Sequence, residues 1–200
     1  MRRPEFAVIE KTEIDQFLQS QRVGVLSVSD EHGVPYAIPM NYIWLHEHIY
    51  LHSALAGKKI TLLRRNPAVQ FTVYKEYAYI PSYVSDTQTA CSASQFFQSV
   101  IIVGQAAFLE AVQEKYDVLD TFMQTFQPEG RYVSLHDTPR DNTILPKTAI
   151  IRIEPHDITA KFKFGQHLKP AHIQQILTFL EQRNAENDRE TIAMIKRYHP

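Results

Sequence analysis

A glycine followed by two lysines is the part of this sequence whose residue types and spacing point most directly to chemistry. Gly57, Lys58 and Lys59 follow a strand-like segment and open a segment with helical spacing. A helix N-terminus carries a partial positive charge and unpaired amides, so it favours an anion and disfavours a cation. We therefore interpret this turn as an anion site suited to a phosphate group. The alternative is two solvated lysines, each tolerating an unfavourable dipole interaction of about 0.5 kcal/mol.

Two neighbouring features add to this interpretation. His52 and Ser53 lead from the preceding strand into the turn, and an imidazole titrates near neutral pH, so His52 is a candidate proton donor. The alternative is a histidine packed beside Tyr50 and the helix start. Pro39 interrupts an alternating strand over 35–45 and has no amide hydrogen, which predicts a sheet edge or a backbone that faces a planar ligand.

Other kinds of site are not supported by the sequence. It has no glycine-rich dinucleotide motif, P-loop, CxxC pair or GxSxG elbow, which argues against the common nucleotide folds and the α/β-hydrolases. The single Cys91 lies in a polar loop over 84–96 without an activating neighbour. His46 and His48 are two residues apart in a predicted turn, and we assign no metal site to them.

Composition favours an ordinary cytoplasmic protein. The net charge is −1 and the charges are interspersed, which gives no footprint for nucleic acid or an anionic membrane. No apolar run approaches the roughly 18 residues of a membrane span, and the N-terminus lacks the apolar core of a signal peptide. One cysteine excludes an internal disulfide framework and fits a reducing compartment.

The elements that must position these residues follow from periodicity. We predict strands at 22–29, 35–45, 49–54, 68–74 with 77–83 as its short continuation, 97–111, 148–153 and 158–164, and helices at 12–18, 58–65, 113–126, 170–183 and 188–198. Thr12 is the expected cap of the first helix, and the last helix is expected at the surface. The strand over 97–111 is the most apolar segment, predicted to be buried on both faces, with Gly104 marking a bend or a close backbone approach. Short strands with inserted helices predict one mainly β domain, an antiparallel barrel with packed helices.

The order of these motifs resembles the FMN-binding split barrel of the pyridoxamine 5'-phosphate oxidase superfamily. The residues that carry the resemblance are Gly33-x-Pro35, Pro39-Met40-Asn41-Tyr42, IYLHSA at 49–54, Gly57-Lys58-Lys59 and Asn66-Pro67. Within the superfamily, the HSA…GKK…NP pattern and the later Cys91…Gln98-Ser99-Val100…Gly104-x-Ala106 pattern are most similar to the nitroimidazole-resistance (Nim) flavoproteins. The resemblance covers residues 1–165, so residues 166–200 form a predicted C-terminal helical extension packed on the barrel.

The resemblance implies a cofactor and a set of residues that bind it. In the oxidases two basic residues shortly before Asn-Pro hold the FMN phosphate, and those positions are Lys58 and Lys59 here. His52 and Ser53 match the strand end beside the flavin, where Nim proteins have a histidine implicated in the chemistry, which makes His52 the candidate catalytic residue. The FMN-binding positions implied on the two long strands are Ile38, Pro39, Met40, Asn41, Tyr42, Gln98 and Ser99.

The sequence also departs from the oxidase pattern. Ser99 stands where the oxidases have a glutamine, although Gln98 is adjacent, and the C-terminal tryptophan and arginine motif that binds their substrate has no counterpart, since the only tryptophan is Trp44. Pyridoxamine phosphate is therefore not the expected substrate. Lys161 and Lys163 match a lysine-rich segment of Nim-like relatives, but we interpret them as a solvated strand face.

Three functions remain open on this basis. The first is an FMN-dependent oxidoreductase that passes electrons to a small acceptor such as a nitroaromatic, working as a homodimer with FMN at the interface, as the superfamily does. The second is a non-catalytic flavin or heme sensor or storage protein on the same barrel, with histidines of the 46–52 region available to heme. The third is a barrel that has lost its ligand and acts through its surface.

Overall fold

The computed structural model describes residues 2–85, 89–135, 137 and 147–200. Its strands are β1 (Ala7–Val8), β2 (Val23–Ser29), β3 (Pro35–Asn41), β4 (Ile43–Leu45), β5 (His48–Ala54), β6 (Ala68–Ile80), β7 (Ser94–Phe108) and β8 (Thr148–Lys163). Its helices are α1 (Lys11–Ser20), α2 (Lys58–Arg65), α3 (Val112–Phe126), α4 (Pro170–Arg183) and α5 (Asp188–Tyr198), with short 3-10 turns at Pro4–Phe6, Ser82–Val84 and Ala90–Ser92. Every helix in the described ranges is too short or too polar to traverse a bilayer.

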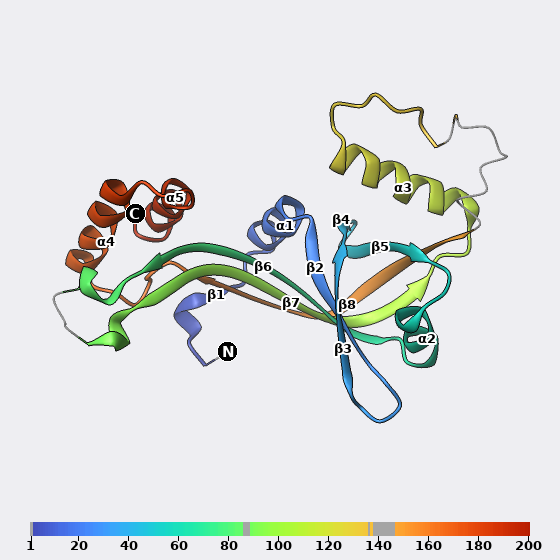
Figure 1. The fold of residues 1–200 in the computed structure, drawn as a ribbon, viewed down its shortest axis with the longest axis horizontal. Coiled ribbons are helices and arrows are strands. Elements are labelled where there is room, and N and C mark those ends of the chain that lie inside the picture. Colours follow the sequence, from blue (N-terminus) through green and yellow to red (C-terminus); the bar gives the residue numbers. More distant parts are fainter. Residues whose placement is uncertain (1, 86–88, 136, 138–146) are drawn as a thin grey trace. The chain divides into compact units, whose positions relative to one another are not determined.

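The strands form one antiparallel sheet (Figure 1). Neighbours follow the order β3-β2-β6-β7-β8-β5-β4, and β1 pairs with β8 off this path. β3 is therefore the last strand at one end of the order, which is the edge position that Pro39 predicts. The predicted mainly β fold with inserted helices is confirmed.

Two predicted strand divisions are wrong. The strand expected over 35–45 is two strands, because Tyr42 leaves the ladder, donates its amide to the Arg22 carbonyl (3.2 Å) and buries its ring. The two strands expected between 148 and 164 are the single strand β8, whereas the expected continuation of the strand over 68–74 is confirmed by β6, which runs to Ile80. The polar residues at 154–157, which suggested a break in β8, are accommodated without one.

Gly104 explains part of that continuity. A Cβ atom at Gly104 would lie 2.2 Å from the Glu154 carbonyl oxygen and 3.2 Å from the Pro155 Cα. Only a residue without a side chain lets β7 pass this close to β8, so the predicted close backbone approach is confirmed. The expectation that β7 is buried on both faces is wrong, since Val103, on the opposite face from buried Val100 and Ile102, is 44% exposed.

The described residues group into two compact units. Unit 1 comprises Met1–Glu10, Tyr74–Val100 and Thr159–Pro200, and unit 2 comprises Lys11–Val73 and Ile101–Ile158. The strands β6, β7 and β8 contribute residues to both. The predicted division into a barrel over 1–165 and an extension over 166–200 stays a prediction.

The core of unit 2 joins β4, β5 and β8 to α3. Its buried members are Ile43, Tyr50, Leu109, Val118, Phe122 and Ile150. On α1, Asp15 accepts a hydrogen bond from the Trp44 indole N–H (2.9 Å), which ties that helix to β4. α1 begins at Lys11, so Thr12 lies inside the helix and is not its cap.

In unit 1 the helices α4 and α5 lie side by side and close a core built on β6, β7 and β8 (Figure 1). Their connection is held by Asp188, which is 1% exposed and accepts hydrogen bonds from the Arg183 guanidinium at 2.9 and 2.5 Å and from the Ala185 amide at 2.8 Å. Thr191 is fully buried and its hydroxyl accepts the Ala78 amide (3.0 Å). α5 is thus anchored by polar bonds that a hydrophobic pattern cannot indicate, and the expectation of a purely surface helix is wrong.

Candidate functional site

The turn between β5 and α2 has the backbone that an anion site needs. Gly57 adopts φ 113° and ψ 168°, a conformation that residues with a Cβ rarely adopt. No side chain caps α2, and its first turn contains no acidic residue. Its first amides have no partner within the helix, so they can donate to a bound anion. Buried Ile60, Leu62 and Leu63 fix the helix against unit 2 and hold this end in place.

The ammonium groups of the two lysines lie against side chains of β3. The Lys58 ammonium stands 4.4 Å from the centroid of the Tyr36 ring, and the Lys59 ammonium lies 3.3 Å from the Met40 sulfur, a weak acceptor. Among the residues that the structure describes, no carboxylate lies within ion-pair distance of either lysine. Burial lowers the pKa of the half-buried Lys59. The structure therefore brings a pair of cations and a helix N-terminus together, as the sequence predicts.

His52 lies next to this pair on β5. His52 is exposed, and its ring meets the Phe122 ring edge-on at 4.7 Å, so α3 supplies a contact that orients it. Partial burial, and secondarily the positive charge of Lys59, lower the pKa of His52 from its ordinary value of 6.5. The imidazole is thus mainly neutral at pH 7. Ser53, the next residue, is half-buried and pairs with Ala149 of β8.

The β3 positions alternate between two environments. Ile38 and Met40 are half-buried, whereas Pro39 and Asn41 are exposed. Tyr42 differs from all of these, because it is fully buried, donates its hydroxyl to the Leu18 carbonyl (2.7 Å) and packs edge-on against Phe71. The Tyr42 side chain is part of the core and its amide is already bonded to Arg22, so the predicted FMN contact of Tyr42 stays a prediction.

Gln98 and Ser99 belong to unit 1, on β7. Gln98 is 6% exposed and its side-chain carbonyl accepts the Tyr77 hydroxyl at 2.7 Å, which accounts for a buried amide without invoking a ligand. Ser99 is half-buried. Their predicted FMN contacts stay predictions.

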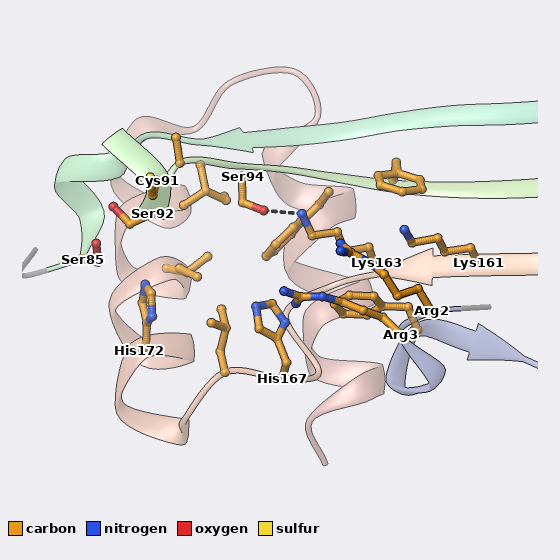
Figure 2. A pocket seen from close by; sticks show the side chains of 17 residues that line it. Arg2, Arg3, Ser85, Cys91, Ser92, Ser94, Lys161, Lys163, His167 and His172 are labelled. Atoms are coloured by element: carbon orange, nitrogen blue, oxygen red, sulfur yellow. Dashed lines mark hydrogen bonds between the residues drawn. The ribbon is translucent and has the colours of Figure 1, made fainter. Parts of the chain in front are cut away.

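A cavity in unit 1 was not foreseen from the sequence. Figure 2 shows that Lys161 and Lys163 of β8 line it together with Arg2 and Arg3 of the N-terminal segment. Both lysines are half-buried, so the interpretation of a solvated strand face is wrong. Their spacing of two residues, which puts both side chains on one face of a strand, was the available signal. The cavity also includes Cys91, which is exposed.

Comparisons with known proteins place the fold. A search of curated proteins found no match. Among solved structures, a 5-nitroimidazole antibiotic resistance protein from Bacteroides thetaiotaomicron is 23% identical, with a TM-score of 0.63 over 78% of this chain and 85% of the other. A flavocytochrome from Azotobacter vinelandii is 17% identical, with a TM-score of 0.64 over 79% and 69%. A protein from Mycobacterium smegmatis that binds FAD and heme is 14% identical, with a TM-score of 0.64 over 78% and 73%.

These structural similarities confirm the split-barrel fold. The family is identified from the sequence. The model of a family described as pyridoxamine 5'-phosphate oxidase matches residues 10–162. That range contains β2 to β7, the Gly57-Lys58-Lys59 turn, His52 and all but the last residue of β8. The chain therefore belongs to the pyridoxamine 5'-phosphate oxidase family.

Proposed function

We propose that this protein binds FMN and works as a flavin-dependent oxidoreductase on small electron acceptors, with nitroaromatic compounds as the substrate class. The observation that carries the proposal is the pair Lys58 and Lys59 at an uncapped helix start, two cations that have no carboxylate partner among the residues the structure describes. Family membership and the fold shared with a nitroimidazole-resistance protein support it.

The residues present fit the phosphate of FMN. Free amides and two ammonium groups are the donor set that stabilises a phosphate dianion, and the absence of an acidic residue in the first turn of α2 leaves no competitor. Lys59, half-buried beside Met40, would make the stronger contact, because its charge is already partly withdrawn from water. Bound there, the flavin would supply one- or two-electron transfer to an acceptor.

His52 would provide the proton that such a reduction requires. Its neutral state at pH 7 follows from partial burial and from Lys59. A phosphate bound at Lys59 would offset that lysine's repulsion and raise the pKa of His52 toward neutrality, where an imidazole serves both as acid and as base. The edge-on contact with Phe122 holds the ring in one orientation while it does so.

A homodimer with FMN at the interface and a cytoplasmic location complete the proposal. One face of β7 supports the dimer: Ile101 is half-buried and Val103 is 44% exposed, apolar surface that a second copy would cover. The cytoplasmic location is supported by the single cysteine.

The test is the absorption spectrum of the protein as purified, followed by titration with FMN and a turnover assay with a nitroimidazole and NADH or NADPH. The expected result is a flavin spectrum, stoichiometric FMN uptake and nicotinamide oxidation that depends on the acceptor. A protein that stays colourless and takes up no FMN would refute the proposal.

A second candidate is heme binding, which the hydrogen bond at one ring nitrogen of His48 favours. The Nδ1 of His48, the half-buried first residue of β5, contacts the His46 carbonyl at 2.6 Å, so Nε2 is the ring nitrogen that would bind the iron. Two proteins of the same fold are described as a flavocytochrome and as a FAD- and heme-binding protein. A Soret band after reconstitution with hemin, lost in His48→Ala, would favour a flavin or heme sensor or storage protein over the oxidoreductase.

A further inference from the structure

Unit 1 contains a cavity of about 600 Å³, which is within the usual size range of small-molecule sites (Figure 2). It is built by segments distant in sequence: the N-terminal residues, the start of β7, the end of β8 and helix α4. The pairing of Ala7 with Lys161 holds the N-terminal segment beside β8, which brings Arg2 and Arg3 to the cavity wall.

The charged groups of the cavity are all basic. Figure 2 shows Arg2, Arg3, Lys161, Lys163 and His167 gathered on one side of it. No carboxylate among the described residues lines the cavity, and the contact of Arg3 with Glu5, at 3.9 Å, is the one ion pair these cations make there.

Glu5 relieves only part of the mutual repulsion within this cluster. Burial, followed by the charges of Lys161 and Arg3, lowers the pKa of Lys163, whose ammonium donates a hydrogen bond to the Ser94 hydroxyl at 2.5 Å. Burial and the charges of Arg3 and Lys163 likewise lower the pKa of His167. An anion in the cavity would offset the repulsion between these groups and raise the pKa of both Lys163 and His167.

The remaining wall combines apolar side chains with the polar residues Ser92, Ser94 and His172. The Lys161 ammonium stands 5.7 Å from the Phe6 centroid and 5.4 Å from the Phe97 centroid, so aromatic rings adjoin the cationic side. Buried Phe96 and Ile176 complete the wall. A simple inorganic ion would use only the cations, whereas an anion with an aromatic or aliphatic body would also cover the apolar wall.

We propose that this cavity binds an organic anion, with a phosphate, carboxylate or sulfonate group against Lys161, Lys163 and Arg2 and an apolar or aromatic body against Phe6, Phe97 and Ile176. The proposal does not depend on flavin binding at Lys58 and Lys59. Two sources share this chemistry, a free organic anion and a flavin phosphate, and the experiment separates them.

The probe is 8-anilinonaphthalene-1-sulfonate, an aromatic sulfonate whose fluorescence rises in apolar surroundings. The full-length protein is titrated with it, and inorganic pyrophosphate is then added as a competitor for the cations. The test variant is K161Q/K163Q, and the matched control is K196Q/R189Q, which removes the same charge from α5 outside the cavity. We expect one saturable site per chain, displacement by pyrophosphate, at least tenfold weaker binding in the test variant and unchanged binding in the control.

A second measurement needs no substitution. Cys91, the only cysteine, lines the cavity, so the occupied cavity should slow its reaction with a thiol reagent in the unmodified protein. An unchanged rate at saturating probe, or equal probe binding by the two variants, would overturn the proposal. FMN titration of K161Q/K163Q distinguishes the sources. Unchanged FMN affinity is expected, and a loss as large as that of K58Q/K59Q would make the cavity part of the flavin site and overturn a separate anion site.

Discussion

The sharpest test of the lysine turn is the substitution Lys59→Gln, which removes the charge and keeps most of the side-chain length. Lys59 is half-buried, and the only contact its ammonium makes among the described residues is with the Met40 sulfur at 3.3 Å. A hydrogen bond to a charged group contributes about 1.5–3 kcal/mol, so the substitution should weaken FMN binding roughly 10- to 100-fold. Lys58 is exposed, and its removal should cost about 1 kcal/mol or less, roughly fivefold.

Lys59→Gln should weaken FMN binding without lowering the stability of the ligand-free protein. Burial lowers the pKa of Lys59, which means that its charged form is disfavoured in the fold and gains no partner in return. Lys59→Gln should therefore leave the free energy of unfolding unchanged or slightly raise it. A residue needed only for folding would show the reverse pattern, with lost stability and lost binding together.

Riboflavin provides the internal control, because it carries the same ring without the phosphate. FMN and riboflavin are titrated into wild type, Lys59→Gln and Arg65→Gln, with flavin fluorescence as the readout. Arg65 lies at the other end of α2, exposed and paired with Glu31 at 3.0 Å, so its loss should change FMN affinity less than twofold. Equal losses for FMN and riboflavin in Lys59→Gln, or no loss for FMN, would refute a phosphate role.

Three further predictions concern other parts of the chain. In Gly24→Ala the new Cβ would lie 2.3 Å from the fully buried Phe71 ring, and overpacking of this kind should lower the free energy of unfolding by about 1–3 kcal/mol in a urea titration. Asp188→Asn weakens the buried bond to Arg183 and should cost about 2 kcal/mol or more by the same measurement. By NMR titration, the pKa of His52 should lie below 6.5 in the free protein and rise when FMN or inorganic phosphate is added.

A specific result would contradict each of these three predictions. Wild-type stability of Gly24→Ala would mean that β2 and β6 separate more easily than the structure indicates. For Asp188, whose pKa is lowered chiefly by Arg183, the stabilisation should be present above the unfolded pKa and disappear as the pH falls through the folded one; a pH-independent difference from Asp188→Asn would contradict this. A His52 pKa that does not move with phosphate would separate the histidine from the anion site.

Local signals in the sequence were enough for most of the elements. Alternating and helical periodicities report which face of a segment is apolar, and the helices over 170–183 and 188–198 begin and end as predicted. Pro39 indicated the edge strand, and Gly104 indicated the close approach of two backbones, because in both cases the covalent structure of one residue limits what can pack beside it. Gly57, Lys58 and Lys59 form a continuous turn, so their juxtaposition is also a local property.

Only the tertiary structure decided what depends on contacts between distant segments. The continuity of β8 comes from partner strands that supply hydrogen bonds across its polar stretch. Tyr42 and Thr191 are buried because their hydroxyls find partners far along the chain, at Leu18 and Ala78, which no local pattern encodes.

The cavity of unit 1 is the clearest example of the same division. The sequence determined that Lys161 and Lys163 share one face of a strand, and it determined the cationic turn at Lys59 by itself. Whether a lysine faces water or a cavity depends on what folds over it, and here residues as distant as Arg2 and Ile176 complete the wall. Local sequence specifies the conformation and polarity of a segment, whereas long-range packing determines which surfaces are withdrawn from water.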